Sequence, residues 1–470
     1  MKLASVYHVI CLLLVPLVLV QSSELTAQER PYPDARSGGN YMHNFYFPPS
    51  PSATPWAPDW SPGGEWIAVA MQGSIWKVDS ATGVAYELIY SEAYLSSPDW
   101  SPDGHWIIYT ADYEHQRIQL EILNTETEET HKLTDDQAIY TDPVFSPDGS
   151  RVAYVSTNPN GYFNLYVRDI VNGQWAGEPV AISEDNNYGN NRLYFGSWDM
   201  HIAPAWLPDG EELLLVSNRN VPLGSGNVLR VPAIKNGIQQ ATTALEEQTL
   251  YRTRPDVSID GKRFVYSSTS GTADQYNNLY VQPTVGGEPY KLTFFQHDAF
   301  HPRWSPDGEW IAFISNASGL SQLMLLETYG GKLVELDITE QHYKQPMGIL
   351  KVRVENGSNA ELTHNRVHLT ASDGKVYTPN NAYARASGRG DMIFHNSGSF
   401  EVYLPEGEAM LEVVKGFEFY PQSINTKIVA VEVNEINITL ERMTDMGAKG
   451  WYSASTHVHA NYGGNLHNTL

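Results

Sequence analysis

The chain has one cysteine, Cys11, among 470 residues. Cys11 lies inside the apolar stretch Val9–Val20, so a mature chain without that stretch would have neither a thiol nor a disulfide and would depend on its core for stability. Basic residues are also few, because 30 Lys and Arg stand against 54 Asp and Glu, giving a formal net charge of −24. Nucleic acids and anionic membranes are bound through basic patches. We therefore expect neither as a partner, and we interpret the acidity as a solubility feature.

Long apolar runs are absent from the sequence after residue 20. The run Val9–Val20 follows a basic start at Lys2 and is too short to span a bilayer, but its length is typical of a signal-peptide core. We predict a signal peptide over residues 1–27, cleaved after Ser22, Ser23 or Ala27. The mature chain is then exported, periplasmic or secreted, and has no transmembrane span.

A short phrase occurs six times along the chain. Each copy has an aromatic or apolar residue, a turn resembling Ser-Pro-Asp-Gly, and then an apolar run. Proline sets φ at the second turn position, aspartate caps the turn and glycine takes the position with positive φ. The six copies are Trp60–Gly64, Trp100–Gly104, Phe145–Gly149, Trp206–Gly210, Val257–Gly261 and Trp304–Gly308.

The spacing of the phrases predicts a β-propeller. Most steps between copies are about 40 to 50 residues, the period of propeller blades. The run after each phrase, such as Trp66–Ala70, reads as a strand buried on both faces, and further strands such as Ser74–Val78 follow. We predict an all-β fold with six four-stranded blades over residues 56–345. The Pro-rich residues 28–55 are an extended lead-in that is a candidate to close the last blade.

The step between the third and fourth phrases is longer and contains an additional loop, residues 184–201. Long loops rich in Asn, Gly and aromatic residues on a rigid scaffold are typical of recognition surfaces. Packing over the propeller face is an equally good interpretation. The candidate partner-binding residues are Tyr188, Arg192, Tyr194, Phe195, Trp198, Asp199 and His201.

Two histidines, His297 and His301, lie close to the sixth phrase. Isolated histidines in such positions are more often hydrogen-bonded loop residues than ligands. We therefore predict that role for both.

After residue 346 the period is lost. Short strand-like segments such as Ile349–Val354 and Ala409–Val414 alternate with turn signals, and they predict a small β-sandwich over residues 346–445. Leu404–Gly407 and Val413–Phe419 resemble carboxypeptidase-regulatory-like, transthyretin-like modules.

The segment 446–470 contains two histidines two positions apart, His457 and His459. On a strand such residues point to the same face and could converge on one cation. By spacing alone the pair is weak support, since a chain with 15 histidines is expected to contain about 0.5 such pairs by chance. A structural role therefore remains open for the pair.

Two resemblances add to this interpretation. The six phrases resemble the WD-repeat-like blades of TolB-type propellers. Gly450–Ser453 followed by His457–Gly464 resembles the opening of CehA/McbA-type metallohydrolases of the PHP superfamily, which are amidohydrolase-like. Exported members of that kind carry a propeller, a small sandwich and then the α/β metallohydrolase domain. The resemblance implies that His457 and His459 bind a divalent metal, zinc, manganese or iron, if that domain is complete; His467 stays unassigned. Ala454-Ser455 departs from the Gly-Asp that many members have before the pair.

Three functions follow as hypotheses. The first is the N-terminal part of an exported metal-dependent hydrolase, with the first strand of the metallohydrolase domain at residues 446–470 and no turnover by residues 1–470 alone. Its substrate is an unknown small molecule or peptide. The alternative is a non-catalytic periplasmic scaffold that binds a protein or ligand. The third, a propeller-gated serine peptidase, is disfavoured because the sequence has no Gly-x-Ser-x-Gly elbow.

Overall fold

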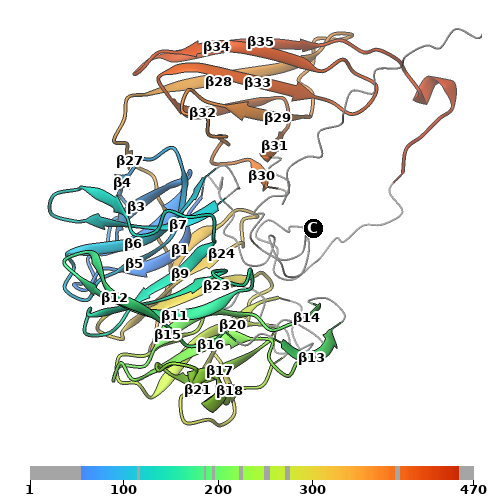
Figure 1. The fold of residues 1–470 in the computed structure, drawn as a ribbon. Coiled ribbons are helices and arrows are strands. Elements are labelled where there is room, and N and C mark those ends of the chain that lie inside the picture. The colour runs from blue at the N-terminus through green and yellow to red at the C-terminus, as the bar shows by residue number, and fades with distance from the viewer. Residues whose placement is uncertain are drawn as a thin grey trace, which may run out of the picture. The chain divides into compact units, whose positions relative to one another are not determined.

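A computed structural model describes residues 54–113, 117–184, 187–192, 196–221, 226–247, 254–269, 276–386 and 392–454. Strands make up nearly all of the regular structure, as Figure 1 shows. The predicted signal peptide and the lead-in up to residue 53 lie outside the described residues. No described helix is long and apolar enough to cross a membrane.

Within the described residues, six consecutive sheets of four strands form the blades of the propeller. Blade 1 consists of β1 (Trp56–Trp60), β2 (Trp66–Met71), β3 (Ser74–Asp79) and β4 (Ala85–Ile89). Blade 2 consists of β5 (Tyr94–Trp100), β6 (Trp106–Tyr113), β7 (Arg117–Asn124) and β8 (Thr130–Lys132). Blade 3 consists of β9 (Tyr140–Phe145), β10 (Arg151–Ser156), β11 (Asn164–Val171) and β12 (Gln174–Ala181).

The second half of the propeller repeats this antiparallel order. Blade 4 consists of β15 (His201–Trp206), β16 (Glu212–Ser217), β17 (Asn227–Pro232) and β18 (Thr242–Leu245), with the 3-10 helix η1 (Gly237–Gln240) before β18. Blade 5 consists of β19 (Asp256–Val257), β20 (Arg263–Ser268), β21 (Asn278–Pro283) and β22 (Tyr290–Lys291). Blade 6 consists of β23 (Ala299–Trp304), β24 (Trp310–Ser315), β25 (Gln322–Glu327) and β26 (Leu333–Glu335).

The repeated phrase forms the turn between the first and second strands of each blade. In blade 2, Gly104 has φ +77° and its N–H donates to Ser101 O at 2.9 Å. The Asp103 carboxylate accepts the backbone N–H of His105 at 3.0 Å, and Ser101 Oγ accepts the N–H of Trp106 at 2.9 Å. The predicted roles of aspartate and glycine are thus confirmed in this turn, and the following strand is buried on both faces.

Contacts between neighbouring turns show that the blades form a closed ring. The turn proline of each blade lies beside the turn glycine of the next, so that a Cβ built on Gly104 would be 3.8 Å from Pro62 Cγ. The last contact returns to the first blade, because a Cβ on Gly64 would be 4.0 Å from Pro306 Cδ. In blade 5, Ile259 takes the place of proline and its Cγ2 would be 3.9 Å from a Cβ on Gly308.

A segment after the sixth blade also joins the seam between blades 6 and 1. The short strand β27 (Gln341–His342) pairs in parallel with β4, with Gln341 opposite Ala85 and His342 opposite Tyr86. The four strands of blade 6 come from one continuous segment. Among the described residues the seam between blades 6 and 1 is therefore covered by the segment that follows the propeller. Most of the lead-in lies outside the described residues, so its role in closing the last blade stays a prediction.

The segment from β28 to β35, here called the second β unit, forms two further sheets that share one core. The first has the order β32 (Ser399–Pro405), β28 (Met347–Asn356) and β35 (Val433–Leu440). The second has the order β30 (Tyr383–Ala386), β31 (Met392–Asn396), β29 (Asn365–Thr370), β33 (Gly407–Val414) and β34 (Gln422–Ile428). Leu350, Val367 and Leu411 belong to the buried cluster that joins them. Membership of a transthyretin-like family stays a prediction.

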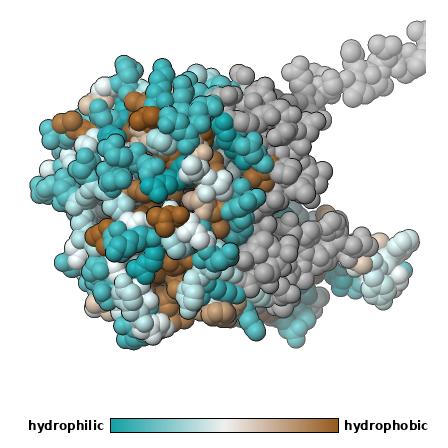
Figure 2. Space-filling view, turned by 90° about the horizontal axis from the view of Figure 1, so that it is seen from below, coloured by the Kyte–Doolittle hydropathy of each residue, from teal (hydrophilic) through white to brown (hydrophobic). Residues whose placement is uncertain are grey.

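The surface of the described residues is mixed in character. Figure 2 shows one face, on which hydrophilic residues predominate and the apolar residues appear as separate patches. Such scattered apolar residues are normal for a protein surface and indicate no docking area by themselves.

Candidate functional site at the propeller axis

The first strand of each blade brings one residue to an equivalent position, directly before the aromatic or apolar residue of the phrase. Four of these six residues are charged: Asp59, Asp99, Asp256 and Arg303, here called the carboxylate layer. Asp59 Oδ2 accepts the backbone N–H of Trp100 in the next blade at 2.8 Å. Asp99 and Asp256 repeat this bond to Phe145 and Trp304, each at 2.7 Å. The carboxylates therefore join neighbouring blades.

Two residues earlier, a second set of residues takes equivalent positions: Ser97, Asp142, Arg254 and His301, here called the bulge layer. Register shifts at the first strands accompany left-handed backbone at this position, with φ +48° at Ser97, +52° at Asp142 and +51° at His301. Asp142 Oδ2 accepts the N–H of Ala203 in the next blade at 3.0 Å. The bulges thereby aim side chains inward that a regular strand would direct elsewhere.

Arg254 reaches across the ring. Its Nη2 forms an ion pair with Asp142 in blade 3 and donates to Ser97 Oγ in blade 2 at 3.4 Å. Blades 2 and 5 are opposite one another in a ring of six, so one side chain can touch both only at the axis. The side chains of Arg254 and Asp142 are 13% and 5% exposed, so the pair is held away from solvent.

Burial dominates the electrostatics of both layers. It raises the pKa of Asp59 to about 7, an effect that the nearby Arg303 guanidinium opposes; Arg303 Nε is 3.9 Å from Asp59 Oδ1. Burial also raises the pKa of Asp99 well above its ordinary value, and the neighbouring Asp59 adds to this rise. The pKa of Asp256 is raised and that of Arg254 is lowered, again chiefly by burial. Four carboxyl groups thus lie near two guanidinium groups at the axis, here called the acidic axis, and burial favours the neutral form of Asp59, Asp99 and Asp256.

The predicted recognition loop is partly described. Tyr188 and Arg192 belong to β13 (Asn187–Arg192), and Trp198 belongs to β14 (Gly196–Trp198); the two strands pair, with Asn187 opposite Trp198. Tyr194 and Phe195 lie outside the described residues. Asp199 and His201 are fully buried, so they support this segment from inside the protein and do not form part of an exposed surface. Partner binding by the loop stays a prediction.

The two histidines near the sixth phrase differ in position. His297 lies in the loop before β23 and stacks on Phe295 with ring centroids 4.5 Å apart, and burial lowers its pKa. His301 is buried on β23 itself, with its ring 4.2 Å from that of Trp56. Predicting a loop position for His301 was therefore wrong, because the bulge places it inside the ring.

The predicted metal ligands His457 and His459 lie outside the described residues. In the part of the chain that is described, no group of three or more His, Cys, Asp and Glu residues could hold a metal ion.

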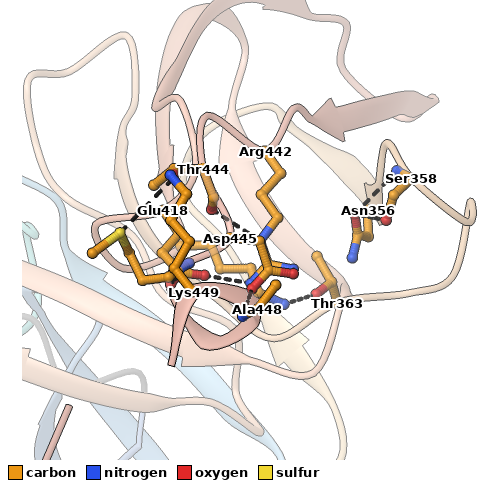
Figure 3. Close-up of polar contacts among 11 residues, drawn as sticks. Asn356, Ser358, Thr363, Glu418, Arg442, Thr444, Asp445, Ala448 and Lys449 are labelled. Carbon is orange, nitrogen blue, oxygen red and sulfur yellow. Dashed lines mark hydrogen bonds and ion pairs between the residues drawn. The ribbon is translucent and has the colours of Figure 1, made fainter. Parts of the chain in front are cut away.

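The segment that leads towards those histidines is described and tightly hydrogen-bonded (Figure 3). Arg442 bridges Asp445, at 2.7 Å, and Glu418, at 2.5 Å. Glu418 Oε1 in turn accepts the N–H of Met446 at 2.9 Å. The helix η2 (Gly447–Lys449) ends at Gly450, with φ +82°, and Trp451 N–H donates to Met446 O at 2.9 Å. The chain therefore leaves the second β unit through an ordered turn.

The six blades and their repeated turns find a direct counterpart in a known family. Residues 97–276 match the family PD40, the TolB beta propeller domain. The chain carries a TolB-like β-propeller. The match spans blade 2 up to the end of the loop after β20, and the turn contacts above extend the same architecture to blades 1 and 6.

Two curated relatives match parts of the chain. One is the uncharacterized peptidase YuxL of Bacillus subtilis, 26% identical over 176 residues, which are 37% of this chain and 22% of that protein. The other is the uncharacterized protein Atu1656 of Agrobacterium fabrum, 27% identical over 230 residues, which are 48% of this chain and 67% of that protein. The chain thus spans about a fifth of the peptidase and two thirds of the Agrobacterium protein.

Solved structures show weaker likenesses. TolB from Acinetobacter baumannii is 18% identical, covers 63% of this chain and 66% of its own, and has a TM-score of 0.44. Oligogalacturonate lyase from Vibrio parahaemolyticus is 15% identical, covers 59% of this chain and 78% of its own, and has a TM-score of 0.41. At these values neither structure assigns an activity to this chain.

Sequence reasoning missed the axial residues. The signal was present in the repeats, because Asp59, Asp99 and Asp256 occupy the same place before the phrase and Arg303 replaces them in the sixth copy. The bulge layer had a weaker signal, since its residues differ in type between blades.

Proposed function

We propose that the chain is the recognition part of an exported, metal-dependent, amidohydrolase-like hydrolase. The propeller binds the substrate or a partner, and a divalent metal at His457 and His459 belongs to the catalytic domain. Zinc, manganese and iron all accept imidazole ligands, and such a metal would polarise the scissile group and lower the pKa of a bound water. The metal role rests on the resemblance of residues 450–464, and export rests on the apolar run at the N-terminus.

The observation that carries the recognition role is the acidic axis. Asp59, Asp99, Asp142 and Asp256 meet at the centre of a rigid ring, and only Arg254 and Arg303 offset them there among the described residues. A cation beside these buried carboxyl groups is little screened by water, so it would shift them from the neutral form that burial favours towards the ionised form and interact strongly with them. This favours a ligand that presents an amine or guanidinium group, such as a basic peptide.

Metal binding tests the hydrolase proposal. The metal role applies where the metallohydrolase domain is complete, so a protein that contains that whole domain is equilibrated with zinc or manganese, and bound metal is measured by mass spectrometry after desalting. We expect His457→Ala/His459→Ala to lose the bound metal, whereas His105→Ala, at an exposed histidine paired with Glu126, keeps it. Equal metal content in all three proteins would refute the metal role. Hydrolysis by residues 1–470 alone, abolished by His457→Ala, would instead refute our expectation that the catalytic site is incomplete in these residues.

Peptide binding tests the recognition role separately. Titration with the C-terminal amide of the tripeptide Lys-Ala-Lys and with its fully acetylated form, followed by tryptophan fluorescence, compares a cationic with a neutral probe. We expect only the cationic form to bind, and Asp256→Asn to weaken it. Binding of neither peptide would remove the acidic axis as the recognition site.

A non-catalytic scaffold is the second candidate. It rests on the propeller alone and needs no feature of residues 455–470. It predicts peptide or protein binding without any metal requirement, so the two experiments above distinguish it from the hydrolase.

A further inference from the structure

Lys375 is buried, with only 1% of its surface exposed to solvent, which is unusual for a lysine. It lies at the tip of the turn after β29, where its backbone N–H donates to Asp373 Oδ1 at 3.0 Å. Its Nζ donates to the backbone oxygen of Gly73, in the turn between β2 and β3 of blade 1, at 3.0 Å. One side chain of the second β unit is thus inserted into the propeller.

Three residues of the first two blades, Gly73, Tyr90 and Tyr94, surround this lysine closely and are here called the socket. The ammonium lies 5.2 Å from the ring centroid of Tyr90 and 5.8 Å from that of Tyr94, within the range of cation–π attraction. Gly73 leaves room for the stem, since a Cβ there would be 2.9 Å from Tyr94 Cδ1 and 3.5 Å from Lys375 Nζ.

Hydrogen bonds around the socket also cross between the two parts of the chain. Tyr90 OH donates to Asp373 Oδ2 at 3.0 Å, and Tyr94 OH accepts the N–H of Val376 at 2.8 Å. Tyr377 OH donates to the same Asp373 oxygen at 2.8 Å. The tip of the turn and the socket therefore fit each other through named polar groups as well as through shape.

The charged groups that face Lys375 compensate its burial in part. Burial lowers the pKa of Lys375 to about 8, and the carboxylates of Asp373 and Glu87 oppose this. Glu87 lies on β4, and burial raises its pKa; its Oε2 accepts the N–H of Lys344 at 2.9 Å. Burial raises the pKa of Tyr94 to about 12, with Asp373 and Asp112 adding to the rise, and it raises those of Tyr90 and Tyr377 as well. The tyrosines therefore stay neutral up to pH 10.

We propose that the turn Asp373–Lys375 is a pH-sensitive latch that holds the second β unit on blade 1 more firmly as the pH rises above neutrality. In the undocked state the lysine faces water and binds its proton with the ordinary pKa of 10.5. The docked state binds that proton more weakly, so below pH 8 docking carries the full cost of burying the charge. This cost falls as the pH rises from 8 towards 10.5. At neutral and lower pH the unit is easiest to release.

Energy transfer between two dyes measures docking directly. The dyes are placed at Ala81→Cys in blade 1 and Ser423→Cys in the second β unit, both exposed, in a Cys11→Ser background. We expect the docking equilibrium constant to rise by about tenfold between pH 7 and pH 9, because each pKa unit corresponds to a factor of ten and the tyrosines, whose ordinary pKa is 10.0, are still neutral in the undocked state over that range.

Three variants test whether the pH dependence of docking comes from Lys375. Lys375→Met has no charge and should stay docked with no pH dependence. Lys375→Arg stays charged throughout and should be less docked, again without pH dependence, so it still decides the matter if the methionine variant fails to fold. Lys427→Met, at an exposed lysine of the same unit, should behave as the unmodified protein. A flat profile for the unmodified protein, or the same slope in Lys375→Met and Lys375→Arg, would overturn the latch.

Discussion

Arg254 in blade 5 forms an ion pair with Asp142 in blade 3, and the two side chains are 13% and 5% exposed. Blades 3 and 5 are not neighbours in the ring, so the pair links blades that share no strand pairing. Each residue is also tied to a further blade, Arg254 to Ser97 and Asp142 to Ala203. The centre of the ring is therefore stabilised by contacts that the sheets themselves do not supply.

Removing one partner of this pair should be strongly destabilising. We expect Arg254→Met to lower the free energy of unfolding by about 3 kcal/mol, because Asp142 is left buried without its counterion. The double variant Arg254→Met/Asp142→Asn should cost less than the sum of the single variants. Urea denaturation measures all three. Lys351→Met is the control, because its pair with Glu401 is half exposed and screened by solvent, so its loss should change the free energy of unfolding little. Additive single costs would show that the pair is not coupled.

Alanine substitutions at two glycines distinguish the cost of backbone strain from the cost of a steric clash. Gly331 has φ +69° and nothing within 4 Å of an added Cβ, so Gly331→Ala should cost only the left-handed strain of about 1 kcal/mol. Gly173 has φ +72°, but a Cβ there would lie 2.5 Å from Trp106 Cζ3 in the preceding blade. Gly173→Ala should therefore lower the midpoint of thermal unfolding clearly further. Equal shifts would mean that Trp106 does not pack on that turn.

The pH dependence of stability should report Asp59. Its folded-state pKa is raised to about 7, so its contribution to stability is fully present below pH 4 and is lost as the pH rises to 7. Asp59→Asn keeps an oxygen for the Trp100 N–H and cannot ionise, so it should gain stability relative to the unmodified protein between pH 4 and pH 8.

Asp79→Asn is the matched control for this measurement. Hydrogen bonds from Thr82 lower the pKa of Asp79, so that residue stabilises the fold above pH 4 and loses this effect at lower pH. Asp79→Asn should therefore be less stable than the unmodified protein, and the difference in free energy of unfolding should be largest at high pH. Urea denaturation at pH 4.5, 6 and 8 follows both variants. If Asp59→Asn changed the free energy of unfolding equally at all three pH values, the raised pKa of Asp59 would be contradicted.

Arg442 should control local order more than global stability. Its partners Glu418 and Asp445 are partly exposed and solvent screens the pairs, so Arg442→Ala should change the free energy of global unfolding little. The amides of Met446 and Ala448, held by those two carboxylates, should exchange with deuterium markedly faster. Arg353→Ala, which removes a pair with Glu355 elsewhere in the unit, should leave these amides unchanged. Unchanged exchange in Arg442→Ala would show that the turn is held by its backbone bonds alone.

The sequence predicted the parts of the fold that depend on local chemistry. Turns such as Ser101–Gly104 have residues whose conformational preferences act within a few positions, and the period between them defines the blades. The strands after each turn follow from their apolar content. The pairing of β27 with β4 was not predictable in this way, because Gln341 and His342 have no strand pattern and pair with residues about 250 positions earlier.

The candidate site depends on contacts of the same distant kind. Arg254 is an ordinary basic residue in the sequence, and its role arises only when the ring brings Asp142, 112 positions away, to the axis. Polar strands such as β34 were missed because Gln422–Ile428 gains its order from pairing with β33. The buried Lys375 reads as a surface residue in its Asp-Gly-Lys turn, and only the socket reverses that expectation.

The closed series of turn contacts constrains how this ring tolerates rearrangement. Each proline meets a glycine of the following blade, and Ile259 meets Gly308 with a bulkier, branched side chain. Blades are therefore not interchangeable modules: transplanting blade 5 beside another neighbour would bring isoleucine against a glycine that is fitted to proline. Circular permutation preserves every one of these neighbours. Genetic reordering of this propeller should accordingly accept new termini between blades while rejecting shuffled, duplicated or deleted blades.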